Sequence, residues 1–69
     1  MTDTVRIHFM FALGDLVRWA ERPAVRWRVI ERHYREGTVS CFIRYRLEPE
    51  ARGQDAMAYE PDLEPWEEA

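Results

Sequence analysis

Residues 25–47 read VRWRVIERHYREGTVSCFIRYRL. Apolar and polar residues alternate in two runs, Val25–Tyr34 and Val39–Leu47, and a polar segment with Gly37 separates them. A period of two is typical of β-strands, because successive side chains of a strand point to opposite faces. We therefore predict a β-hairpin whose strands are joined by a turn at residues 35–38.

Shorter segments with strand and turn signatures flank this hairpin. They are a strand over Thr4–Met10, a turn over Ala12–Asp15, a strand over Leu16–Trp19, a strand over Ala56–Tyr59 and a helical turn over Glu60–Glu64. Residues 66–69 form either a final strand or a loose tail. With 69 residues and 46% hydrophobic residues, the chain is long enough for one small domain only. The pattern predicts an all-β domain of about five strands with an extra N-terminal strand.

Several of these segments resemble parts of SH3-like small barrels, such as Tudor and KOW modules. Residues 11–18, FALGDLVR, are similar to the opening strand of that fold, where a hydrophobic residue and Gly-Asp precede a strand with valine. The hairpin resembles the central hairpin, and Tyr59–Pro65 resembles the short strand and helical turn before the last strand. The resemblance implies a barrel over residues 11–66, with residues 1–10 as the extra strand and residues 67–69 as the end of an acidic tail.

One enzyme family of this architecture, the type II plasmid dihydrofolate reductases, begins its barrel with a similar Phe-x-x-Gly-Asp-x-Val-Arg. Residues 11–18 fit this pattern, but Trp19 stands where that family has a substrate-binding lysine. The family's Val-Gln-Ile-Tyr active-site segment corresponds to Ala56–Tyr59, which keeps only the tyrosine. The resemblance therefore supports the fold, and a reductase activity is only a remote alternative.

Charge is distributed unevenly along the chain. Residues 1–46 contain nine arginines and five acidic residues, a net charge of +4, whereas residues 47–69 contain one arginine and eight acidic residues, a net charge of −7. Strict alternation places one set of residues on the outward face of the hairpin: Arg26, Arg28, Ile30, Arg32, Tyr34, Phe42, Arg44 and Arg46. It places the pair Glu31 and His33 on the inward face.

The arginine and aromatic residues of this face are the first candidate binding site. Neighbouring arginines repel one another unless a nearby negative charge compensates their positive charges. Phosphates of a nucleic acid would supply that charge, and Tyr34 or Phe42 could stack on a base. Acidic groups of a protein partner would supply the negative charge equally well. Alternatively, Glu21, Glu36 and the acidic tail of the same chain could neutralise the face. A one-residue bulge would exchange some inward and outward residues.

The predicted N-terminal strand is the second candidate. Val5, Ile7 and Phe9 form an apolar ridge that a five-stranded barrel does not need. Such a ridge either pairs with a second copy of the chain or folds over the open end of its own barrel.

Other residue patterns argue against catalysis, metals and membranes. Cys41 is the single cysteine, and His8, His33 and Cys41 lack the short paired spacings of a zinc site. Arg6 and His8 interrupt the apolar stretch Val5–Leu13, so we do not expect this stretch to be a signal peptide or a membrane span. We therefore expect an intracellular protein. No catalytic constellation and no cofactor motif is present. We predict a non-enzymatic protein-interaction or self-association module of bacterial or phage kind, with nucleic-acid binding as the alternative.

Overall fold

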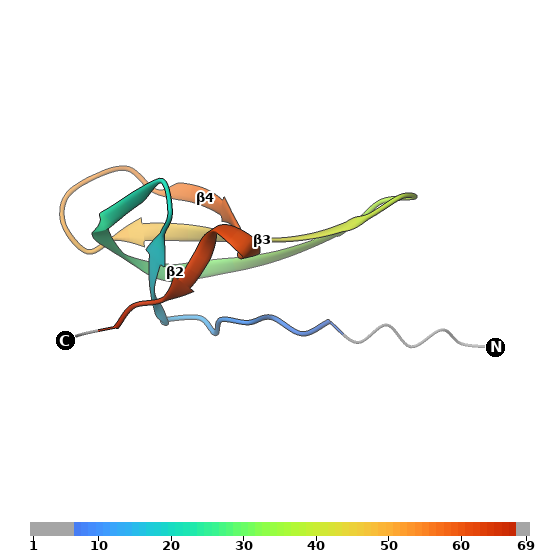
Figure 1. Cartoon of the computed structure of the whole chain (residues 1–69), viewed down its shortest axis with the longest axis horizontal. Coiled ribbons are helices and arrows are strands. Elements are labelled where there is room, and N and C mark those ends of the chain that lie inside the picture. The colour runs from blue at the N-terminus through green and yellow to red at the C-terminus, as the bar shows by residue number, and fades with distance from the viewer. Residues whose placement is uncertain (1–6, 68–69) are drawn as a thin grey trace.

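The computed structural model describes residues 7–67 and contains one antiparallel sheet of five strands (Figure 1). The strands are β1 (Leu16–Trp19), β2 (Arg22–Glu36), β3 (Cys41–Pro49), β4 (Ala56–Tyr59) and β5 (Leu63–Pro65), and the 3-10 turn η1 (Glu60–Asp62) joins β4 to β5. Their order in the sheet is β4-β3-β2-β1-β5. No α-helix occurs between residues 7 and 67. The prediction of an all-β domain is confirmed.

The short elements lie close to their predicted positions, whereas β2 begins earlier than expected. Leu16–Trp19 and Ala56–Tyr59 are strands, and η1 lies within the predicted helical turn. β2 starts at Arg22 and includes Pro23, which the sequence placed in a connection. The register with β1 shifts between Arg18 and Trp19, so residues 23–25 have no partner on β1. A proline lacks the N–H that a ladder needs, and it is tolerated at such an irregularity.

The central hairpin contains a bulge that changes which residues share a face. Val29 pairs with Leu47, but Glu31 pairs with Arg46, so Ile30 is an extra residue in β2. Beyond the bulge, Arg32 lies opposite Tyr45 and Tyr34 opposite Ile43.

This bulge makes part of the predicted arrangement wrong. Arg32 and Tyr34 share the inner face with the buried Tyr45, and they do not join the other arginines. Glu31 and His33, which were expected inside, lie on the outer face opposite Arg46 and Arg44. The physical reason is that one additional residue reverses the alternation of every residue that follows it.

The core lies on the inner face of the sheet and receives a side chain from every strand. Its buried residues are Phe11, Val17, Trp27, Val29, Tyr45, Leu47, Ala58 and Leu63. Edge-to-face ring contacts order its larger side chains, with centroid distances of 5.5 Å for Phe11 and Tyr45 and 5.6 Å for Trp19 and Trp27. Phe11 precedes β1, so the segment before the sheet is part of the core.

The extra N-terminal strand is not found in the part of its range that the structure describes. Residues 7–10 have no strand structure, while residues 4–6 lie outside the described residues. In Figure 1 this segment, in blue, runs below the central hairpin. Side chains of other elements bind the chain where this segment ends: the Met10 N–H donates to the Glu60 carboxylate of η1, and the Phe11 N–H donates to the Tyr45 hydroxyl of β3.

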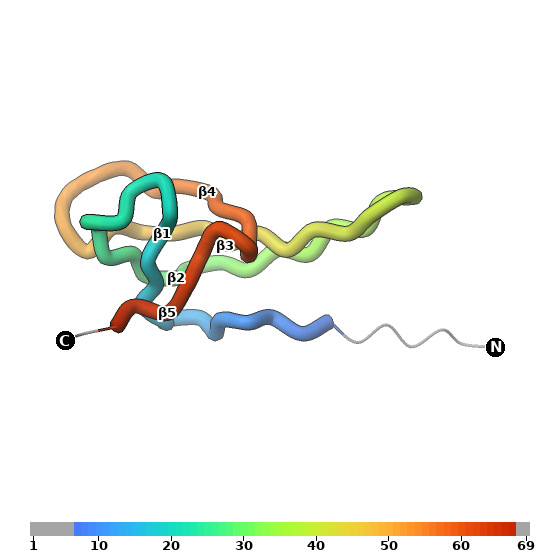
Figure 2. Tube along the Cα trace, viewed as in Figure 1, coloured from blue at the N-terminus to red at the C-terminus, as the bar shows by residue number. Residues whose placement is uncertain are grey.

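The end of the hairpin projects beyond the rest of the sheet (Figure 2). β1 pairs with β2 only as far as Arg28, and β4 pairs with β3 only from Arg44 onward. Within residues 7–67, residues 34–36 and 41–43 therefore pair only with each other. This two-stranded end is where the sheet exposes backbone on both edges.

The predicted turn before β1 is present and depends on Gly14. The Asp15 N–H donates to the carbonyl of Ala12 at 3.1 Å, and the Ala12 N–H donates to Oδ2 of Asp15 at 2.9 Å. Gly14 has φ +91°, as the third residue of a type II turn requires. A Cβ added at Gly14 would meet no atom within 4 Å, so its cost would be conformational only.

Gly14→Ala should therefore destabilise the protein by about 1 kcal/mol, because an L-residue is strained at positive φ. The free energy of urea unfolding measures this. A chemically synthesised chain with D-alanine in place of Gly14 is the control, since a D-residue adopts positive φ without strain. Equal losses in both variants would contradict the assignment of the cost to backbone conformation.

Candidate functional site

The open edge of β3 is the main feature that distinguishes the projecting end of the hairpin. β4 ends at Tyr59, opposite Arg44, so Cys41, Phe42 and Ile43 have no strand partner on that side within residues 7–67. An unpaired edge presents backbone N–H and C=O groups that can pair with another strand. Proteins usually protect such an edge with lysine, proline or a covering segment, and this one carries Cys-Phe-Ile.

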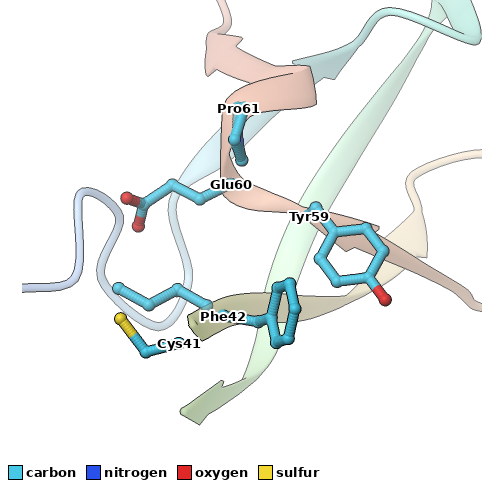
Figure 3. Close-up of a pocket in the computed structure, with 6 residues that line it drawn as sticks. Cys41, Phe42, Tyr59, Glu60 and Pro61 are labelled. Carbon is cyan, nitrogen blue, oxygen red and sulfur yellow. The ribbon is translucent and has the colours of Figure 1, made fainter. Parts of the chain in front are cut away.

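A groove runs along this edge (Figure 3). Its volume is about 380 Å³, and it is lined by Cys41, Phe42, Ile43, Tyr59, Glu60 and Pro61. Five of these six residues present carbon, sulfur or ring surface. The groove therefore combines an apolar wall with a free backbone edge.

Two aromatic rings form one side of the groove. The centroids of Phe42 and Tyr59 are 6.0 Å apart, with the ring planes tilted by 59°. Phe42 is 46% exposed and Tyr59 is 48% exposed, which is unusual for large rings in a chain whose core is so small. Exposed aromatic side chains beside a groove are typical anchors for a binding partner.

Glu60 holds the opposite wall of the groove in place. Its carboxylate accepts hydrogen bonds from the Tyr45 hydroxyl and from the Met10 N–H, the latter at 3.1 Å. The Tyr45 hydroxyl also accepts from the Phe11 N–H at 3.3 Å. This network joins the segment before β1 to β3 and η1. Burial, followed by the hydrogen bond to Glu60, raises the pKa of Tyr45 to about 12.

This raised pKa predicts a loss of stability at high pH. In the unfolded chain Tyr45 ionises near its ordinary pKa of 10.0, whereas the folded chain holds the proton up to about pH 12. The free energy of unfolding should be unaffected by this group below pH 10 and should fall between pH 10 and 12, by up to about 2–3 kcal/mol. Urea unfolding at pH 8, 10 and 11 measures the slope.

Tyr45→Phe is the control for this prediction. It should be less stable at pH 8 by about 1–2 kcal/mol, because the Phe11 N–H loses its partner. It should also lose most of the slope above pH 10. The same slope in both proteins would show that Tyr45 is not the group responsible.

The predicted binding residues divide into two sets. Arg26, Arg28, Phe42, Arg44 and Arg46 lie on the outer face, as expected, whereas Arg32 and Tyr34 lie on the inner face. The Arg32 guanidinium lies 4.7 Å from the ring centroid of Phe9, so it stacks within the chain. Of the five arginines that were predicted to share one binding face, at most four can therefore bind a partner together on the outer face.

Acidic residues of the hairpin region neutralise much of this outer face. Glu50 pairs with Arg26 and, at 3.7 Å, with Arg28, and Glu31 pairs with Arg46 at 2.5 Å. The hydrogen bond from Arg46, followed by that from His33, holds the pKa of Glu31 below its usual range. The sequence pointed to Glu21, Glu36 and the tail for this role, but Glu31 and Glu50 perform it.

The predicted self-association residues are partly engaged inside the chain. Phe9 is half-buried, and its ring centroid lies 6.2 Å from that of Tyr45 in an edge contact. Ile7 is 39% exposed, and Val5 lies outside the described residues. The contact between Phe9 and Tyr45 agrees with the alternative that this segment folds over its own chain. Self-association through Ile7 stays a prediction.

The end of the chain also packs on the body. The Trp66 N–H donates to the carbonyl of Leu16 at 3.1 Å, and the Arg18 guanidinium lies 5.0 Å from the Trp66 ring centroid. Arg18 also pairs with Glu64 at 3.4 Å. Trp66 is therefore tied to β1, and the loose-tail alternative does not hold for it. The alternative of a final strand at residues 66–69 is not found at residues 66–67, because β5 ends at Pro65, and residues 68–69 lie outside the described residues.

Residues of the groove other than Phe42 were missed by the sequence analysis. Tyr59 was expected in a short strand and Glu60 and Pro61 in the helical turn after it, while alternation along Val39–Leu47 places Cys41 and Ile43 on the inward face of the hairpin. One signal was available: the predicted strand Val39–Leu47 is nine residues long, whereas Ala56–Tyr59 has four. Two neighbouring strands of such different lengths leave part of the longer one uncovered.

Comparisons with known proteins do not indicate a function for this chain. They find no matching family model, no matching curated protein and no matching solved structure. Residues 7–67 contain no group of three or more His, Cys, Asp or Glu side chains placed to hold a metal ion. No helix of the described chain has the length and apolar character needed to cross a membrane.

Proposed function

We propose that this chain is a non-enzymatic protein-interaction module that binds an extended segment of a partner along the free edge of β3. The observation that carries the proposal is the unpaired backbone of Cys41–Ile43 beside an apolar groove of about 380 Å³. An added strand would receive main-chain hydrogen bonds from the edge, which supply affinity, and side-chain contacts in the groove, which supply specificity.

The projecting hairpin supports this mode of binding. A partner strand would continue the line of β4 along β3, since β4 ends at Tyr59. Phe42 and Tyr59 would lose their exposed apolar surface on binding, which favours association by about 25 cal/mol per Å². The groove wall at Glu60 is held by the Tyr45 network before binding, so less ordering is needed.

The strand arrangement also supports an SH3-like barrel over residues 11–66. The two edge strands, β4 and β5, are consecutive in the chain and are joined only by η1. The first and last strands pair with each other, at Val17 with Pro65 and at Trp19 with Leu63. This order, with a long central hairpin and a short helical turn before the last strand, fits the resemblance found in the sequence.

The outer-face ion pairs favour a protein partner over a nucleic acid. Guanidinium groups already paired with Glu31 and Glu50 would have to leave those carboxylates to bind phosphates. Labelled single- and double-stranded oligonucleotides should accordingly show little change in fluorescence anisotropy at low salt. Tight binding that weakens steeply with added salt, and that is lost on charge reversal at Arg28 and Arg44, would favour the nucleic-acid alternative instead.

A peptide selection tests the proposed function. Random 12-residue peptides selected on the wild-type protein should bind Phe42→Lys at least about tenfold more weakly, because the lysine removes an apolar anchor and charges the edge. Val39→Lys is the matched control. Val39 is also an exposed apolar residue, at 95%, and it does not line the groove, so the same substitution there should leave binding unchanged.

Amide hydrogen exchange adds a readout of the backbone itself. A bound peptide should slow exchange within Cys41–Ile43, where the free protein has unpaired groups. Peptides that bind without protecting these amides, or that bind both variants equally, would overturn the proposed site.

A further inference from the structure

We infer that the segment recognised by the β3 edge carries carboxylate side chains on one face and apolar side chains on the other. The inference rests on the proposed strand addition, and it concerns the chemistry of the partner. It follows from how charge is distributed on the two sides of the edge.

On the outer face, two arginines without an acidic partner lie next to the groove. Arg35 is opposite Phe42 in the β2–β3 ladder, and Arg44 is opposite Tyr59 in the β3–β4 ladder. These four residues and Gly37 line a hollow of about 270 Å³. Within residues 7–67, neither Arg35 nor Arg44 forms an ion pair.

This hollow contrasts with the rest of the same face. Closer to the body of the sheet, Arg28 and Arg46 have Glu50 and Glu31 as partners. Arg35 and Arg44 thus form an uncompensated positive patch at the point where a partner strand would lie. A side chain opposite Phe42 would be a diagonal neighbour of Arg44, within reach of two long side chains. The two oxygens of a carboxylate in that position could accept hydrogen bonds from a guanidinium, whose N–H groups match them in geometry.

The inner side of the edge favours apolar residues. Cys41 and Ile43 point to this side, and Pro61 closes the groove there. Glu36 lies opposite Cys41, and Glu60 borders the groove with its carboxylate already bound by Tyr45. An acidic side chain on this side would meet like charge and lose water without a partner. Alternation along the added strand thus separates acidic from apolar positions.

A second copy of this chain fits the patch poorly as an occupant. Pairing of two β3 edges about a two-fold axis at Phe42 would place Arg44 of one copy opposite Ser40 of the other. Residues 39–46 contain no acidic side chain, so the edge of a second copy would bring no carboxylate to Arg35 and Arg44. Charge complementarity therefore selects an acidic segment of a different protein.

Two synthetic peptides of opposite charge test the inference. The probes are acetylated and amidated (Glu-Val)4 and (Lys-Val)4, titrated into the 15N-labelled full-length protein at low salt. (Glu-Val)4 should shift the amide resonances of Cys41–Ile43 and bind at least about tenfold more tightly than (Lys-Val)4, and this difference should shrink at higher salt.

Removal of the two charges provides the matched variants. Arg35→Gln/Arg44→Gln should bind (Glu-Val)4 about fivefold or more weakly, because the variant loses two ion pairs to the peptide. Arg22→Gln/Arg52→Gln makes the same change of net charge at two exposed arginines away from the hollow, and it should bind as wild type does.

The outcomes separate this inference from the proposed function. Equal binding of both peptides at Cys41–Ile43 would overturn the acidic specificity and leave strand addition standing. Resonance shifts elsewhere, or no binding of either peptide together with failure of the random-peptide selection, would overturn both. A dimer in sedimentation at micromolar protein, with Cys41–Ile43 protected in the absence of peptide, would overturn the choice of a foreign partner.

Discussion

The hydroxyl of Tyr45 is the polar group around which the chain is organised. It lies in a side chain that is fully buried, so it must find partners inside the protein. It accepts from the Phe11 N–H and donates to Glu60, and Glu60 in turn accepts from the Met10 N–H. Three segments far apart in the chain are thereby held together. Glu60 directly follows Tyr59, so this network lies where the chain leaves β3 and the edge of Cys41–Ile43 stays uncovered.

The bulge at Ile30 has a comparable effect on charge. It brings Glu31 to the outer face, where its carboxylate meets Arg46, and it takes Arg32 to the inner face, where the guanidinium covers Phe9. Without it, five arginines would share one face with few acidic neighbours. The bulge lies where β2 leaves β1, since the last main-chain bonds across that side are made by Val29 with Gly14 and Asp15. On the outer face of the hairpin, Arg35 and Arg44 have no acidic partner within residues 7–67, and both lie towards its end.

Edge, groove and positive patch therefore meet at the same end of the hairpin. The edge follows from the difference in length between β3 and β4, the groove from the path of η1, and the patch from the bulge. A long unprotected edge with apolar residues is a risk for aggregation. On β3 the exposed stretch is only three residues long, with Arg44 directly after it and Arg35 opposite Phe42 on β2. Such a short edge suits selective pairing with a partner segment.

The alternation in Val25–Tyr34 and Val39–Leu47 was enough to predict the hairpin, because strand periodicity is a local property of the chain. The turn at Gly14, the strand at Ala56–Tyr59 and the helical turn after it were predictable for the same reason. The faces of Arg32 and Tyr34 were not, since a bulge arises from the register between two strands. The groove at Tyr59 and Glu60 was equally hidden, because it depends on where one strand stops beside another. Local patterns in the chain thus account for the all-β class and most of the turns. The pairing of charges and the extent of the open β3 edge depend on contacts between residues distant in the chain, so they emerge only in the folded protein.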